Sequence, residues 1–252
     1  MVPRSNIEWK WWGEMDPLWG VSSVPGKKRS DHEAWNTVDF YQSGRATVDA
    51  LVSCLRSFAP SGGVCLEIGC GAGRLTRALA SHFGSVIGLD VSPGMVRYAR
   101  SQLREHNVGL CIMDGNTLPI RTGSVNTVFS FWVFQHFDNV GIGFEYLKEA
   151  YRVLAPDGTL LLQLPIYHLP RGVSRPLTRL VYGCSKLLGD LRAKYYRERL
   201  KRGASLELMR GTEYDAEQVL EVAHSAGFSE VEYRSVYLSA SGSRETIVLA
   251  RK

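Results

Sequence analysis

Hydrophobic residues follow two patterns along this chain. Short, continuous apolar runs bounded by glycine, proline or polar residues predict buried parallel strands at residues 64–68, 85–90, 109–113, 124–130 and 159–164. Between most of these runs, apolar residues recur every three or four positions, which predicts amphipathic helices. Strands that alternate with helices favour a doubly wound α/β sheet with helices on both faces.

The later part of the sequence continues with one helix and two further strands. Asp215 precedes an apolar helical pattern that stops at Gly227, a residue that commonly ends helices. Apolar runs within residues 230–239 and 245–250 predict the last two strands. We therefore expect a single seven-stranded domain, which suits a chain of 252 residues.

The stretch from Val64 to Thr76 carries the strongest signal for a ligand site. Its apolar strand is followed by glycines at 69, 71 and 73, and then by leucines at helical spacing. Glycine permits positive φ angles and leaves no Cβ between the backbone and a ligand. The helix that follows also offers unpaired N–H groups at its start. The pattern predicts a tight strand-to-helix turn that binds a ligand.

The spacing of these glycines distinguishes between ligands. Dinucleotide sites use G-x-G-x-x-G, whereas Gly69, Gly71 and Gly73 form G-x-G-x-G and Arg74 stands where the third dinucleotide glycine is expected. Glu67, two residues before the first glycine, would repel a pyrophosphate and attract a cation. These residues resemble the first motif, E-x-G-x-G-x-G, of class I S-adenosylmethionine-dependent methyltransferases. The resemblance implies that Glu67 and the glycine turn hold the aminoacyl end of S-adenosylmethionine.

Two further strand ends are candidates for the nucleoside part of this cofactor. Asp90 ends the second strand, where a carboxylate can accept hydrogen bonds from both ribose hydroxyls; the alternative is a turn or capping aspartate. Met95, in the next helix, packs either on the adenine or in the core. Asp114 and Gly115 resemble the family's loop after the third strand, which implies an adenine contact; the alternative is a simple Asp-Gly turn.

Residues on both sides of the glycine turn extend the predicted site. Phe131 and His136 follow the fourth strand and are expected to face cofactor and substrate. His136 is the candidate general base for a hydroxyl acceptor, with His168 second; the alternative is a structural histidine. By the resemblance, Tyr41 and Arg45 reach the methionine carboxylate; a core tyrosine and a surface arginine are the alternative.

A second resemblance lies at residues 152–158, where R-V-L-x-P-x-G precedes an apolar strand. Asp157 occupies the place of the family's usual first glycine in this turn. The family fold implies a Rossmann-like, mostly parallel sheet of seven strands with the last strand antiparallel. We assign residues 41–165 and 214–252 to this S-adenosylmethionine-binding methyltransferase domain.

Two segments lie outside the resemblance. Residues 1–40 contain five tryptophans interrupted by proline and glycine, which predicts an irregular lid or strap. Residues 166–213 hold eleven basic and four acidic residues in a chain of net charge +5, so the basic character is local. Apolar residues at helical spacing within them predict a basic amphipathic helix. It either caps the substrate crevice, packs with a solvated charged face, or contacts a membrane surface.

Composition narrows the class of protein. No run of about 18 apolar residues exists, and the first residues lack an apolar signal core, so we expect a cytoplasmic protein. Five cysteines without C-x-x-C spacing agree with a reducing compartment. The six histidines form no ligand-spaced cluster, so no metal site is predicted.

The sequence favours methyl transfer from S-adenosylmethionine to a small-molecule acceptor. The acceptor would be a secondary metabolite, lipid or glycolipid precursor, methylated on oxygen or nitrogen. One alternative is a nucleic-acid-binding protein or methyltransferase that uses the basic insertion, although no D/N-P-P-Y-like motif follows the fourth strand. A nicotinamide oxidoreductase is the other alternative, and Arg74 and Glu67 disfavour it.

Overall fold

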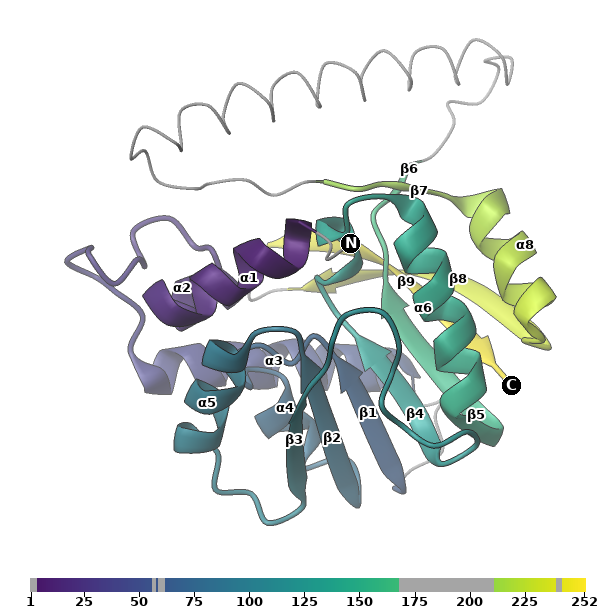
Figure 1. The fold of residues 1–252 in the computed structure, drawn as a ribbon, viewed down its shortest axis with the longest axis horizontal. Helices are drawn as coiled ribbons and strands as arrows, with labels where there is room; N and C mark the ends of the chain where they lie inside the picture. Colours follow the sequence, from purple (N-terminus) through teal and green to yellow (C-terminus); the bar gives the residue numbers. More distant parts are fainter. Residues whose placement is uncertain (1–3, 56–57, 59–61, 168–210, 239–241) are drawn as a thin grey trace, which may run out of the picture.

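The computed structural model describes residues 4–55, 58, 62–167, 211–238 and 242–252. At its centre is a seven-stranded open sheet in the order β3-β2-β1-β4-β5-β9-β8 (Figure 1). Strands β1 to β5 run parallel, whereas β9 is inserted antiparallel between β5 and β8. The predicted fold class, including the antiparallel last strand, is confirmed. The strands are β1 (Val64–Ile68), β2 (Ser85–Asp90), β3 (Val108–Ile112), β4 (Val125–Ser130), β5 (Leu154–Gln163), β8 (Glu230–Leu238) and β9 (Ser243–Arg251).

Helices cover both faces of this sheet. Alternate residues of a strand point to opposite faces, and accordingly Leu66 packs in one apolar cluster and Cys65 in another. The first cluster contains α6 and α8, and the second contains α3 and α4 (Figure 1). A third cluster joins α5 to α3. These helices are α3 (Thr37–Leu55), α4 (Thr76–Leu79), α5 (Pro93–Gln102), α6 (Val140–Val153) and α8 (Ala216–Ala226).

Two predicted helix boundaries are confirmed in atomic detail. The Asp215 side chain accepts a hydrogen bond from the backbone N–H of Gln218 and so caps α8. The same helix ends at Gly227, whose φ of 112° only glycine adopts without strain. The spacing of the leucines after the glycine turn suggests a longer helix than the structure has. The helix there, α4, covers only four residues. The Asn107 side chain binds the carbonyls of Ala80 and Phe83 just beyond it.

The N-terminal segment was predicted to be irregular, and this prediction is wrong. It forms α1 (Arg4–Met15) and α2 (Pro17–Val21), with Asp16 capping α2. Among the described residues of this segment, the first proline is Pro17, so no proline interrupts α1. Gly13 is its one glycine, and a Cβ there would collide with the Ser92 hydroxyl. Glycine at this position therefore allows α1 to lie directly against α5.

The predicted basic insertion falls mostly outside the described residues, since residues 168–210 are not among them. Its two ends lie side by side, because β6 (Ile166–Tyr167) pairs in parallel with β7 (Tyr214–Asp215). The basic helix and its role as a cap therefore stay predictions. Within the described part of the chain, no helix is both long and apolar enough to cross a membrane.

Candidate functional site

A cavity of about 570 Å³ lies at the carboxyl ends of β1, β2 and β4. Its wall is formed by the turn after β1, the ends of β2 and β4, and residues of α1, α2, α3 and α5. Open α/β sheets bind their ligands at this edge, where the strand order reverses. In this sheet the order reverses between β1 and β4, so the cavity lies at the expected place.

The glycine turn forms the floor of the cavity. Gly69, Gly71 and Gly73 have φ angles of 78°, 51° and 82°, in the left-handed region that favours glycine. A Cβ on Gly71 would lie 2.5 Å from Val21 of α2, and one on Gly69 would collide with Val133. Gly69 and Gly71 line the cavity, whereas Gly73 packs outside it against Leu103.

Asp90 stands at the end of β2 with its carboxylate in the cavity wall. One oxygen accepts the Gly71 N–H and the other the Ser92 N–H, both at 2.8 Å. An ionised carboxylate can accept about four hydrogen bonds, so it retains capacity for two further donors. Burial raises its pKa to about 6, although these backbone bonds favour the charged form. The position suits a ligand with adjacent hydroxyl groups.

Two buried groups of opposite charge lie beside the glycine turn. Glu67 on β1 is 2% exposed and accepts a hydrogen bond from the Thr76 hydroxyl. Burial raises the Glu67 pKa to about 8, against the lowering effects of Thr76 and Arg74. Arg74 is 4% exposed, and burial lowers its pKa to about 10. Both line the cavity. Arg74 was not among the predicted site residues, although its place directly after the glycine turn could have suggested that it lines the cavity.

Glu67 is expected to make the stability of the ligand-free protein depend on pH. Its pKa in the folded protein, about 8, is above the ordinary 4.5, so folding favours the protonated form. The contribution of Glu67 to the free energy of unfolding is therefore fully present below about pH 4.5. It is lost as the pH rises toward 8, by at most about 1.4 kcal/mol per pH unit. Glu67→Gln should reduce the fall in the free energy of unfolding between pH 6 and 8. This window is chosen because it lies above the raised pKa of Asp90, which is about 6. Denaturant unfolding at several pH values measures it, and an equal slope in both proteins would contradict this assignment.

Three other predicted site residues also line the cavity: Met95, Phe131 and His136. Met95 is buried beneath Gly20 of α2, and Phe131 is buried directly after β4. His136 ends the short helix η1 (Phe134–His136), and its ring meets the edge of Trp9 of α1 at 4.8 Å between centroids. The imidazole therefore lies where α1 meets the end of the sheet.

Tyr41 and Arg45 do not line the cavity. The Tyr41 hydroxyl donates to the carbonyl of Ala72, beneath the glycine turn. Arg45 is exposed and pairs with Asp49, four residues along the same helix. The cavity-facing residues of α3 are instead Ser43 and Thr47. Each residue turns a helix by about 100°, so Arg45 points away from the face that these two share.

The loop after β3 places Asp114 and Gly115 outside the cavity wall as well. The exposed Asp114 carboxylate accepts the N–H groups of Asn116 and Thr117 in its own turn, and these bonds hold its pKa below the ordinary value. The Asp114 carbonyl accepts a hydrogen bond from Asn6 of α1. The neighbouring residue Met113 is the one that lines the cavity.

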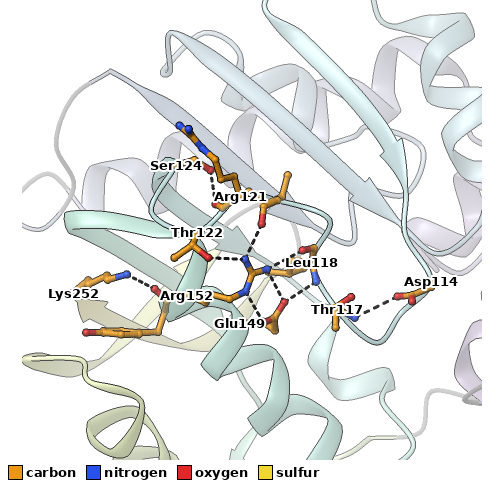
Figure 2. Close-up of polar contacts among 11 residues, drawn as sticks. Asp114, Thr117, Leu118, Arg121, Thr122, Ser124, Glu149, Arg152 and Lys252 are labelled. Carbon is orange, nitrogen blue, oxygen red and sulfur yellow. Dashed lines mark hydrogen bonds and ion pairs between the residues drawn. The ribbon is translucent and has the colours of Figure 1, made fainter.

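Arg152, the arginine of the R-V-L motif, holds this same loop in place (Figure 2). Its guanidinium donates to the carbonyls of Leu118 and Ile120 and pairs with Glu149 at 2.7 Å. Glu149 in turn accepts the Leu118 N–H. The loop between β3 and β4 is therefore fixed to α6, and Arg152 has a structural role.

The first helix is docked over the cavity by polar contacts far apart in sequence. Asp138, which follows η1, accepts the backbone N–H groups of Arg4 at 2.6 Å and Ser5 at 3.2 Å. These donors have no partner within their own helix, so Asp138 acts as a cap from another element. Glu14 pairs with Arg97 of α5 at the other end of α1. Residues of α1 and α2 thus form part of the cavity wall, and the role of this segment as a lid stays a prediction.

Comparison with known proteins agrees with this geometry. A family model described as a methyltransferase domain matches residues 66–162. The chain is 28% identical over 176 residues, 67% of its length, to a probable S-adenosylmethionine-dependent methyltransferase of Mycolicibacterium smegmatis. It is 33% identical over 115 residues, 45% of its length, to a malonyl-[acyl-carrier protein] O-methyltransferase of Hahella chejuensis. It spans 58% and 39% of these relatives, respectively, which is less than two thirds of either.

A solved structure shares the fold over nearly the whole chain. Magnesium protoporphyrin IX methyltransferase from Synechocystis, with bound S-adenosylhomocysteine, superposes with a TM-score of 0.61 at 19% identity. The match covers 98% of each chain. The likeness therefore extends beyond the residues that the family model matches.

Proposed function

The chain carries a class I S-adenosylmethionine-dependent methyltransferase domain, and from this premise we propose that it methylates a small-molecule acceptor. One observation carries the proposal. A single cavity joins the glycine turn and Asp90 to a region lined by Trp9, Trp132 and His136. Its volume of about 570 Å³ is within the range of about 300–1,000 Å³ found for small-molecule sites.

The residues of the first region fit the cofactor. The remaining acceptor capacity of Asp90 suits the two ribose hydroxyls, and Gly69 and Gly71 bring the backbone of the turn into the cavity wall. Glu67 offers its carboxyl group to the ammonium of the aminoacyl end. Met95 and Phe131 supply apolar surface beside these groups. When bound, S-adenosylmethionine supplies a methyl group already activated by its sulfonium.

The protein then has to align an acceptor atom and exclude water. Alignment of this kind lowers a barrier by up to about 7–11 kcal/mol. Half-buried Trp9 and Trp132 form part of the cavity wall, and α1 is docked beside them; we propose that they limit the access of water to the bound acceptor. For a hydroxyl acceptor, we assign to His136, which lines the cavity, the role of taking the proton as the oxygen is methylated. Aromatic lining by Trp9, Trp132 and Phe137 favours an acceptor with an apolar body.

The relatives support a small acceptor without identifying it. One is named for an acyl-carrier-bound malonyl group and the solved neighbour for a porphyrin, so related folds accept chemically different substrates. The acceptor class proposed here is an apolar compound, such as a polyketide, lipid or glycolipid precursor, with a polar end that carries the methylated atom.

Calorimetry with S-adenosylhomocysteine and a methylation screen test this function. The purified protein should bind S-adenosylhomocysteine with one site per chain. It should also transfer labelled methyl groups from S-adenosylmethionine to members of an apolar acceptor library. Absence of cofactor binding would refute the proposal. Binding together with transfer to nucleic acid alone would refute the small-molecule part of it.

A further inference from the structure

The last strand of the chain brings a carboxylate into the cavity wall that has no role in the site described so far. Glu245 of β9 lines the cavity together with Ser243. Because β9 runs antiparallel beside β5, its first residues lie at the carboxyl end of β5, where the Leu164 N–H donates to the carbonyl of Thr246. The cavity therefore extends beyond the end of β4 to the start of β9.

The order of the strands separates Glu245 from the groups assigned to the cofactor. In the sheet, β9 is the third strand from β1, with β4 and β5 between them. Neighbouring strands lie about 4.8 Å apart, so β9 is about 14 Å from the strand that carries Glu67. Asp90, on β2, is one strand farther away. Glu245 thus lies on the side of the cavity opposite the ribose site, where the proposed function requires an acceptor.

A buried polar chain fixes the position of this carboxylate. The Ser243 hydroxyl donates to its Oε1 at 2.7 Å, and the side-chain amide of Gln163 donates to its Oε2 at 3.0 Å. Gln163 is 2% exposed, and its amide oxygen accepts the Trp132 N–H at 3.3 Å. Both ends of the glutamine amide are therefore used, which links the end of β4 to Glu245.

Trp132, at the other end of this chain, is held in an unusual conformation. Its φ is 58°, in the left-handed region where a bulky residue is strained. Strain that is retained by surrounding hydrogen bonds is typical of functional sites. Trp132 also lines the cavity, so Gln163 holds an aromatic ring and a carboxylate in one wall.

The Glu245 carboxylate has hydrogen-bonding capacity that the described residues do not use. An ionised carboxylate can accept about four hydrogen bonds, and the described residues supply two. Among these residues no cation forms an ion pair with Glu245, and Arg74 of the same cavity lies instead over the Trp132 ring. A carboxylate in a partly apolar wall is costly unless it is paired. Its remaining capacity suits a ligand that donates hydrogen bonds.

We propose that Glu245, positioned by Gln163, is a specificity-determining residue that binds an O–H or N–H donor on the methyl acceptor. The inference rests on the proposed function, because the ligand is the acceptor itself. An ionised carboxylate accepts hydrogen bonds and repels another carboxylate. It therefore selects alcohols, phenols and amines with an apolar body and rejects acids at this position.

Three probes with the same ring test this inference on the complex with saturating S-adenosylhomocysteine. Benzylamine is a cationic donor at neutral pH, benzyl alcohol is a neutral donor, and benzyl methyl ether has no donor. In NMR titrations, wild-type protein should bind at least one of the two donors about 10- to 100-fold more tightly than the ether. The donor with the larger preference identifies the group as an amine or a hydroxyl.

Two variants assign this preference to Glu245. Glu245→Gln removes the charge but can still bind Gln163 and Ser243, so a preference for benzylamine should fall at least 10-fold. Glu245→Ala should abolish the preference for either donor. The affinity for the ether should stay unchanged in both variants, a result that a merely structural role would not give. Glu232→Gln is the matched control, because Glu232 lies on the neighbouring strand β8, pairs with Arg234 and does not line the cavity.

The outcomes separate this inference from the proposed function. Wild-type protein that fails to bind S-adenosylhomocysteine would contradict the function. If the wild type binds it but binds the three probes equally, or binds none of them, the role of Glu245 is refuted and the function stands. Equal effects of Glu232→Gln and Glu245→Gln on the preference would refute that role as well.

Discussion

Substituting His136 by alanine is expected to lower kcat by roughly 10²- to 10⁴-fold, the usual contribution of a general base. The reason is its place in the cavity wall after β4, against Trp9, and histidine is the side chain that most often serves as a general base. The affinity for S-adenosylhomocysteine should remain within a few-fold of wild type, since the residue is not expected to hold the cofactor. Steady-state kinetics with an identified hydroxyl acceptor, together with calorimetry, measure both quantities.

Two controls separate chemistry from packing at this position. His136→Gln keeps a polar side chain of similar reach but cannot accept a proton at neutral pH, so it should be nearly as slow as alanine. Trp9→Phe alters the ring that His136 packs against and that lines the acceptor region, so it should raise KM more than it lowers kcat. Near wild-type kcat in His136→Gln would make the histidine structural, and the base assignment would fall.

Replacing Asp90 by alanine is expected to weaken cofactor binding by about 100-fold or more, because hydrogen bonds to a charged acceptor contribute about 1.5–3 kcal/mol each. Calorimetry with S-adenosylhomocysteine gives the dissociation constants. The variant also removes the acceptor for the Gly71 and Ser92 N–H groups, so part of the loss reflects the glycine turn itself.

A ligand-side comparison isolates the ribose contribution. An analogue of S-adenosylhomocysteine without the ribose hydroxyls should bind wild type poorly and should bind Asp90→Ala no worse than the parent ligand does. Asp49→Ala, an exposed aspartate on α3, is the control for loss of one negative charge. Unchanged affinity in Asp90→Ala would remove this residue from the site.

Most of the sheet could be predicted from the sequence because buried parallel strands are nearly continuous apolar runs. The position of Asp90 was equally accessible, since it depends only on a strand end following the glycine turn. Both features are set by residues that are neighbours in the sequence, so they can be predicted without knowing which distant elements pack together.

The remaining features depend on contacts between residues far apart in the chain. Asp138 caps a helix that begins 134 residues earlier, and no local pattern indicates such a partner. Arg45 and Thr47 lie two positions apart on one helix, and which of them faces the cavity depends on how that helix is rotated against the glycine turn. The burial of Arg74 in the cavity wall became visible only in the structure.

The insertion of β9 between β5 and β8 has a consequence for how this chain is made. Leu161 on β5 pairs with Leu249, so one edge of β5 stays open until a segment almost ninety residues later has been synthesised. During that interval the ribosome-bound chain presents an apolar strand edge, the kind of surface that promotes aggregation. Pairing at such sequence separation is also intrinsically slow. Heterologous production should therefore benefit from abundant chaperones, which protect this edge until β9 arrives.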